Sequence, residues 1–195
     1  LCSALSEGGL TPSAGFAAQA CLLGITVFAL IRPRGGDFLY SPKEVETMVT
    51  DIKMLKQLGV DGVVIGCLKD DGSIDIEACR KLVDAASGLN ITFHRAFDRC
   101  RDPKVALEQI IDLGCNRLLT SGQQATAADG VDLIKELVQQ ANGRICIMPG
   151  CGVNAQNAAQ ILKYTGATEI HASASHNVAS KMKFNREEVY MGAKG

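Results

Sequence analysis

The chain has 195 residues, of which 47% are hydrophobic and 21% charged, and this composition indicates one soluble globular domain over residues 1–195. A net charge of −1 and the lack of tryptophan argue against a nucleic-acid or membrane-surface partner. No apolar run approaches the roughly 20 residues that cross a bilayer.

Eight cysteines are spread over the apolar segments, and none forms a Cys-x-x-Cys pair. An even number of cysteines indicates disulfides mainly in short secreted chains with small cores. In a chain of this size the pattern is typical of reduced, buried cysteines in a cytoplasmic protein.

Uninterrupted apolar segments alternate with segments of helical periodicity along the whole chain. The apolar segments predict the end of a strand at 1–3 and further strands at 25–31, 60–66, 89–94, 115–120, 144–148 and 168–172. Between them, caps and periodicity predict helices over 11–23, 41–58, 75–86, 102–114, 130–141 and 154–166. Thr11-Pro12 is the expected start of the first helix, and Ser41 and Glu44 form a capping box for the second.

A strand and a helix that recur every 24 to 35 residues predict an α/β fold with a parallel sheet. A TIM (β/α)₈ barrel fits best, although only seven strands are visible. We therefore expect the barrel to lack its first strand and helix here, and also its final helix. A doubly wound open sheet is the alternative, but no Gly-x-Gly-x-x-Gly or P-loop sequence follows a strand, so no nucleotide cofactor is expected.

Two arginines follow the buried segment 25–31, in the sequence Ile31-Arg-Pro-Arg-Gly-Gly-Asp-Phe38. Ligands bind at the carboxyl ends of parallel strands, and Arg32 and Arg34 beside flexible glycines are suited to an anionic group, with Asp37 nearby. The alternative is a structural loop whose arginines pair with neighbouring carboxylates.

Polar residues also follow the other strands, and a barrel would bring them to one mouth. His94 is a candidate general acid or base, or a metal ligand, although a hydrogen-bonded core histidine is equally plausible. Asp98 and Glu7 are candidates to assist it. Further candidate ligand-binding residues follow successive strands: Arg95, Ser121, Gly150, Gly152 and His171.

The segment around Gly150 and Gly152, followed by Asn154, is similar to loops that hold phosphate through backbone N–H groups, or is simply a tight turn before a helix. Cys2, beside Glu7, is the cysteine best placed for a soft metal such as Cu(I). A buried, inert cysteine is the alternative there, and Cys67 and Cys151 are weaker candidates.

Five strings identify the chain as similar to the CutC copper homeostasis family: LCSALSEGGLTPS at 1–13, IRPRGGDF at 31–38, TFHRAFD at 92–98, LTSG at 119–122 and MPG at 148–150. The resemblance implies a TIM barrel, a cytoplasmic homo-oligomer and Cu(I) bound through thiols, with Cys2 as one ligand. It also implies a second cysteine ligand in a preceding strand that this sequence does not contain. The family usually has glycine at the position of Cys151.

Two functions follow from these observations. The first is Cu(I) binding through Cys2, in copper tolerance or trafficking. The second is an enzyme that acts on a small anionic or phosphorylated metabolite, with Arg32 and Arg34 binding the anion and His94 moving a proton. A third possibility is a scaffold that acts through its oligomer surface.

Overall fold

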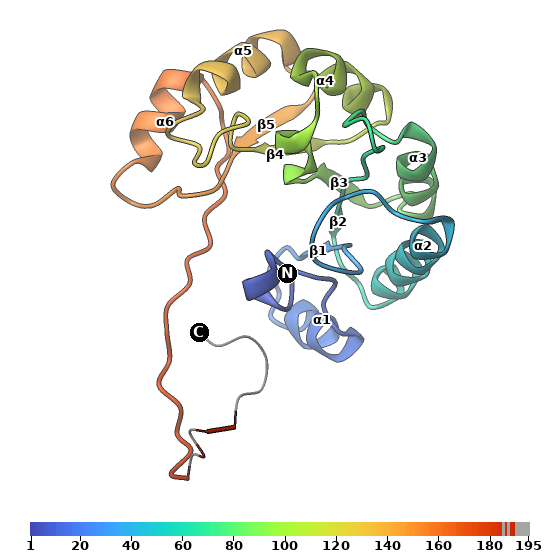
Figure 1. Cartoon of the computed structure of the whole chain (residues 1–195), viewed down its shortest axis with the longest axis vertical. Helices are drawn as coiled ribbons and strands as arrows, with labels where there is room; N and C mark the ends of the chain where they lie inside the picture. The colour runs from blue at the N-terminus through green and yellow to red at the C-terminus, as the bar shows by residue number, and fades with distance from the viewer. Residues whose placement is uncertain (185, 187, 190–195) are drawn as a thin grey trace.

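A computed structural model describes residues 1–184, 186, 188 and 189. Its five parallel strands are β1 (Phe28–Leu30), β2 (Gly62–Ile65), β3 (Asn90–Phe93), β4 (Arg117–Thr120) and β5 (Cys146–Pro149), which pair in chain order. The six α-helices are α1 (Ala14–Cys21), α2 (Pro42–Gln57), α3 (Ile76–Ala85), α4 (Pro103–Asp112), α5 (Val131–Ala141) and α6 (Ala158–Thr165). The helices lie on the outer side of a curved sheet, as in part of a (β/α) barrel (Figure 1).

The core lies between the outer face of the sheet and the helices. Alternate strand residues such as Val63, Phe93 and Leu118 are fully buried there, against helix residues such as Met48 and Leu82. Full burial of one such side chain contributes about 1.5–3 kcal/mol. The intervening residues face the concave side of the sheet, as strand alternation requires.

An interaction across the concave face measures how strongly the sheet curls. The Arg117 guanidinium carbon of β4 lies 5.1 Å from the centre of the Phe28 ring of β1, although β2 and β3 separate the two strands. Gly62 of β2 makes room for this ring, because a Cβ atom at Gly62 would lie 2.3 Å from Phe28 Cε1. The curvature is therefore that of a barrel wall.

The predicted strands at 1–3 and 168–172 are wrong as strands. Leu1 bonds the backbone of β1 at Phe28 and Leu30, and His171 donates one backbone hydrogen bond to Pro149 of β5, but neither segment forms a ladder. Within the described part of the chain each of these segments has a strand on one side only, which limits its pairing. Residues 173–184 form neither helix nor strand, as predicted, and part of the predicted loop 173–195 lies outside the described residues.

Two predicted helix starts differ from those in the structure. Ser13, not Thr11, caps α1, because the Thr11 hydroxyl accepts a hydrogen bond from the Arg32 backbone N–H at 2.9 Å instead. Asn154 caps a turn, not the helix, since α6 begins only at Ala158. The capping box of Ser41 and Glu44 is confirmed.

Candidate functional site

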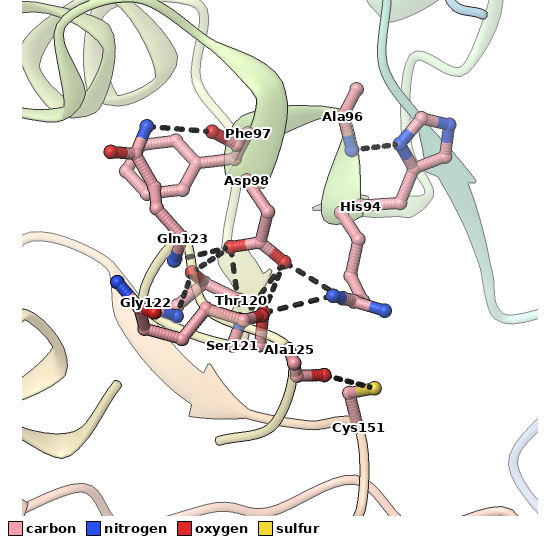
Figure 2. A network of polar contacts seen from close by, with 12 residues as sticks. His94, Ala96, Phe97, Asp98, Thr120, Ser121, Gly122, Gln123, Ala125 and Cys151 are labelled. Carbon is pink, nitrogen blue, oxygen red and sulfur yellow. Dashed lines mark hydrogen bonds and ion pairs between the residues drawn. The ribbon is translucent and has the colours of Figure 1, made fainter. Parts of the chain in front are cut away.

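Asp98 is the centre of a polar network at the carboxyl ends of β3 and β4. It lies in the short 3₁₀ helix η2 (Arg95–Arg99), which the sequence did not predict. Its carboxylate accepts hydrogen bonds from the Thr120 hydroxyl (2.5 Å), the Ser121 backbone N–H (3.0 Å), the Gln123 backbone N–H (3.2 Å) and Arg95 Nε (2.7 Å) (Figure 2). Its side chain is only 6% exposed. The network joins η2 to the loop after β4.

Arg95 and Ser121 belong to this same network, as their positions after neighbouring strands predicted. Arg95 Nη2 donates to the Ser121 hydroxyl at 2.9 Å, so the two residues contact each other as well as Asp98. The Arg95 side chain is 40% exposed, which leaves part of its guanidinium facing solvent. Thr120 belongs to the LTSG string at 119–122, whereas Gln123 was missed, because its role depends on the fold of η2.

His94 lies at the end of β3 but is turned away from Asp98 (Figure 2). Its Nδ1 accepts a hydrogen bond from the Ala96 backbone N–H at 3.1 Å, so the ring proton is on Nε2. Burial, and then the charge of Arg32, lower the pKa of His94 to about 3. The imidazole is therefore neutral near pH 7 and presents a donor, which favours hydrogen bonding over the predicted acid or base role.

Arg32, at the end of β1, links the loop at residues 7–9 to the loop at residues 33–40 through hydrogen bonds. Its Nη1 donates to the carbonyls of Glu7 (2.6 Å) and Gly9 (3.0 Å), and its Nη2 donates to that of Gly36 (3.0 Å). The residue is 7% exposed and has no carboxylate partner among the described residues. Arg32 thus combines a structural role with a buried, uncompensated positive charge.

Arg34 forms an ion-paired loop, as the structural alternative described. Its Nε lies 2.6 Å from Glu44 Oε1, its Nη1 lies 3.0 Å from Asp37 Oδ1, and its Nη2 donates to the Leu39 carbonyl at 2.7 Å. The Ser41 backbone N–H, and then Arg34, lower the pKa of Glu44 to about 2. Two carboxylates therefore neutralise Arg34, and Asp37 is exposed beside it.

Phe38 and Tyr40 were not predicted as site residues, yet Phe38 packs beside His94 and Arg32, and the Tyr40 ring lies against Arg34. The Phe38 ring centre lies 5.0 Å from that of His94 and 5.2 Å from the Arg32 guanidinium carbon. Gly66, at the end of β2, allows His94 this position, because a Cβ atom there would lie 2.5 Å from the imidazole. Phe38 stands in the IRPRGGDF string, and Tyr40 follows two residues later.

The glycine loop after β5 lies against the segment 168–172, which contains His171. A Cβ atom at Gly150 would lie 2.4 Å from Leu119 and 3.2 Å from the His171 side chain. Cys151 and Gly152 both have left-handed backbone conformations, with φ of 80° and 70°. Glycine adopts this conformation without strain, which explains why glycine suits the position that Cys151 holds. The Cys151 thiol contacts the Ala125 carbonyl at 3.2 Å.

Cys2 is a half-buried, free thiol near the mouth. Its sulfur lies close to Gly9, since a Cβ atom at Gly9 would be 3.2 Å from it. Glu7 lies in the short helix η1 (Leu5–Glu7), where its side chain is exposed and its carboxylate lies beside Gly35. Within the described residues, no three His, Cys, Asp or Glu side chains are grouped closely enough to hold a metal ion.

Four other thiols are poorly suited to metal binding. Burial raises the pKa of Cys100 to about 11 and that of Cys115 to about 12, and it also raises the pKa of Cys146. The neighbouring Cys79 thiol, and then burial, raise the pKa of Cys67. These four groups keep their protons near neutral pH, and the thiolate is the form that binds metal.

A model of the CutC family matches residues 1–176. The chain belongs to the CutC family. A CutC family protein of Bacteroides fragilis (strain YCH46) is 56% identical over 194 residues, which cover 98% of this chain and 77% of that protein. A human CutC relative, named copper homeostasis protein cutC homolog, is 50% identical over 194 residues, which cover 99% of this chain and 71% of that protein.

Solved structures agree with the CutC assignment and with the barrel. A CutC structure from Streptococcus agalactiae is 39% identical and has a TM-score of 0.85, covering 88% of this chain and 85% of that one. An aldolase with a TM-score of 0.65 is 14% identical and covers 80% of this chain and 73% of that one, so the likeness is one of fold alone. The predicted α/β fold of TIM-barrel type is confirmed. None of the described helices is long and apolar enough to cross a membrane.

Proposed function

We propose that this CutC family member acts in copper homeostasis by binding Cu(I) as cargo through the Cys2 thiol. The human relative carries copper homeostasis in its name. Thiolates are the ligands that Cu(I) prefers, and Cys2 is a free, half-buried thiol beside the mouth loops. The observation that carries the proposal is the position of Cys2 beside Gly9. It brings a thiol to the loop at residues 7–9, which Arg32 holds by hydrogen bonds.

Copper handling of this kind fits a cytoplasmic protein, where thiols stay reduced. We extend the proposal to a cytoplasmic homo-oligomer. Size-exclusion chromatography with light scattering, together with localisation of the tagged protein, tests both parts.

Anaerobic Cu(I) titration against a chromophoric competitor tests the role of Cys2. We expect the variant Cys2→Ser to lose most of the Cu(I) affinity of the wild type, because serine offers no thiolate. The matched control is Cys21→Ser, which removes another half-buried thiol, located in α1. Equal Cu(I) affinity of Cys2→Ser and wild type would refute the proposal.

A second candidate function is an enzyme acting on a small anionic metabolite at the mouth. The observation that favours it is Arg32, a buried cation with carbonyl partners but no carboxylate partner in the described part of the chain. Taking a charge out of water is costly unless an opposite charge compensates it. In this second proposal the neutral His94 imidazole donates a hydrogen bond instead of moving a proton, and Arg34 holds its own loop in place instead of binding the anion. A thermal-shift screen with small anions tests it: an anion that raises the Tm is the expected result.

A further inference from the structure

Three buried donors without partners lie in or against the loop that follows β1, and Phe38 of this loop contacts two of the three residues. Among the described residues, four buried side-chain polar atoms lack a hydrogen-bond partner, and three of them are Arg32 Nε, Tyr40 Oη and His94 Nε2. We call these three atoms the donor cluster. Unpaired buried polar atoms are rare and each costs about 1–3 kcal/mol, so three in one place need a physical reason.

Arg32 and His94 flank the same Phe38 ring, and Tyr40 follows two residues after Phe38 in the loop that comes after β1. The charge of Arg32 acts on both of the other groups, since it opposes the rise in the pKa of Tyr40 and adds to the fall in that of His94. Burial keeps the Tyr40 phenol protonated, with a pKa of about 12.

All three groups carry a hydrogen to donate. His94 donates through Nε2 because Nδ1 already accepts from Ala96. Tyr40 can accept from Arg32, but its own proton would still lack an acceptor. The three groups therefore cannot all form hydrogen bonds with one another, and oxygen acceptors from another molecule would pair the remaining donors.

Charge selects among the molecules that offer oxygen acceptors. Arg34 is neutralised by Glu44 and Asp37, whereas Arg32 brings one positive charge with no counter-ion in the described chain. A monoanion balances this charge, while a phosphate dianion would leave a surplus negative charge in a buried place. Phe38 on one side adds an apolar wall.

We propose that Arg32, Tyr40 and His94 bind the carboxylate group of a small monocarboxylic acid. The inference rests on the second candidate function and names the ligand class and the residues that hold it. Because Phe38 lies over two of the three residues, we expect its side chain to move when the acid enters.

The test titrates the full chain with pyruvate, acetate and inorganic phosphate. Binding is measured by calorimetry and by NMR of the His94 Nε2 proton. We expect pyruvate or acetate to bind and to shift that proton resonance. Tyr40→Phe and His94→Gln should each weaken binding about tenfold or more, as loss of a hydrogen bond to a charged group does. Tyr40→Phe should fold as well as the wild type, because it deletes only an unpaired hydroxyl. Tyr164→Phe, which removes a hydroxyl bonded to Asp132, is the matched control and should leave binding unchanged.

The failures are distinguishable. If no anion binds the wild type, the second candidate function is refuted and this inference falls with it. If an acid binds but Tyr40→Phe and His94→Gln bind it equally well, the donor cluster is refuted and the candidate function stands. If phosphate binds and the carboxylic acids do not, the choice of a monocarboxylate is overturned.

Discussion

Replacing Asp98 by asparagine tests whether the network at β3 and β4 holds this end of the sheet together. Asparagine keeps the shape of the side chain but turns one oxygen acceptor into an NH₂ donor. In either orientation of the amide, that donor would face the Ser121 N–H together with a second donor, which is Arg95 Nε or the Gln123 N–H. A hydrogen bond to a charged group contributes about 1.5–3 kcal/mol, so losing two of them lowers the free energy of unfolding by about 3–6 kcal/mol.

Urea denaturation followed by far-UV circular dichroism measures this loss. The matched control is Asp37→Asn, because Asp37 pairs with Arg34 on the surface and its side chain is 67% exposed. We expect the control to cost less than about 1 kcal/mol. Hydrogen exchange should show faster exchange at the Ser121 and Gln123 amides in the Asp98 variant. A loss below 1 kcal/mol for Asp98→Asn, similar to that of the control, would refute the reasoning.

Three further predictions concern the backbone and the concave face. Cys151→Gly should stabilise the fold by about 0.5–1 kcal/mol in urea denaturation, because glycine removes the left-handed strain at φ 80°; a loss of stability would contradict this. Gly66→Ala should destabilise by more than about 2 kcal/mol, since the new Cβ meets the His94 ring, whereas Gly15→Ala in open space on α1 should stabilise slightly; equal melting temperatures would count against this geometry. Arg117→Met should lower stability at pH 7 and lower it less at pH 3. Arg117 lowers the pKa of Glu169, so the pair stabilises fully above the ordinary glutamate pKa of 4.5, and this stabilisation is lost as the pH falls through the lower folded pKa. Urea midpoints at the two pH values measure the difference, and a loss that is the same at both would disprove the role of the pair.

Local sequence signals predicted the parts of the fold that local interactions determine. The capping box needs only Ser41 and Glu44, three residues apart, and the structure has it as predicted. Thr11 was mistaken for a helix cap because its partner, the Arg32 backbone, is 21 residues away. The segments 1–3 and 168–172 were predicted as strands from their apolar residues. Whether such a segment forms a strand depends on its neighbours in the sheet, which sequence periodicity does not describe.

The site was predictable as a set of strand ends but not as a set of contacts. The sequence places Arg95, Asp98 and Ser121 after neighbouring strands, and they do meet. It does not reveal that Arg32 bonds to carbonyls, because any residue offers a carbonyl. Nor does it reveal that the His94 ring lies over Gly66, since the burial that fixes its protonation comes from the assembled core.

The hydrogen bonds of Arg32 to two loops have a consequence for how the two proposed ligands, Cu(I) and a monocarboxylic acid, affect each other. One guanidinium joins the Gly9 carbonyl, next to the Cys2 sulfur, to the Gly36 carbonyl in the loop that carries Phe38. If Cu(I) at Cys2 shifts the first loop, the Arg32 hydrogen bonds connect that shift to the second loop, and an acid that displaces Phe38 would act on the first loop through the same bonds. Thermodynamic linkage makes such an effect equal in both directions, so copper and the acid should each alter the affinity for the other by the same factor.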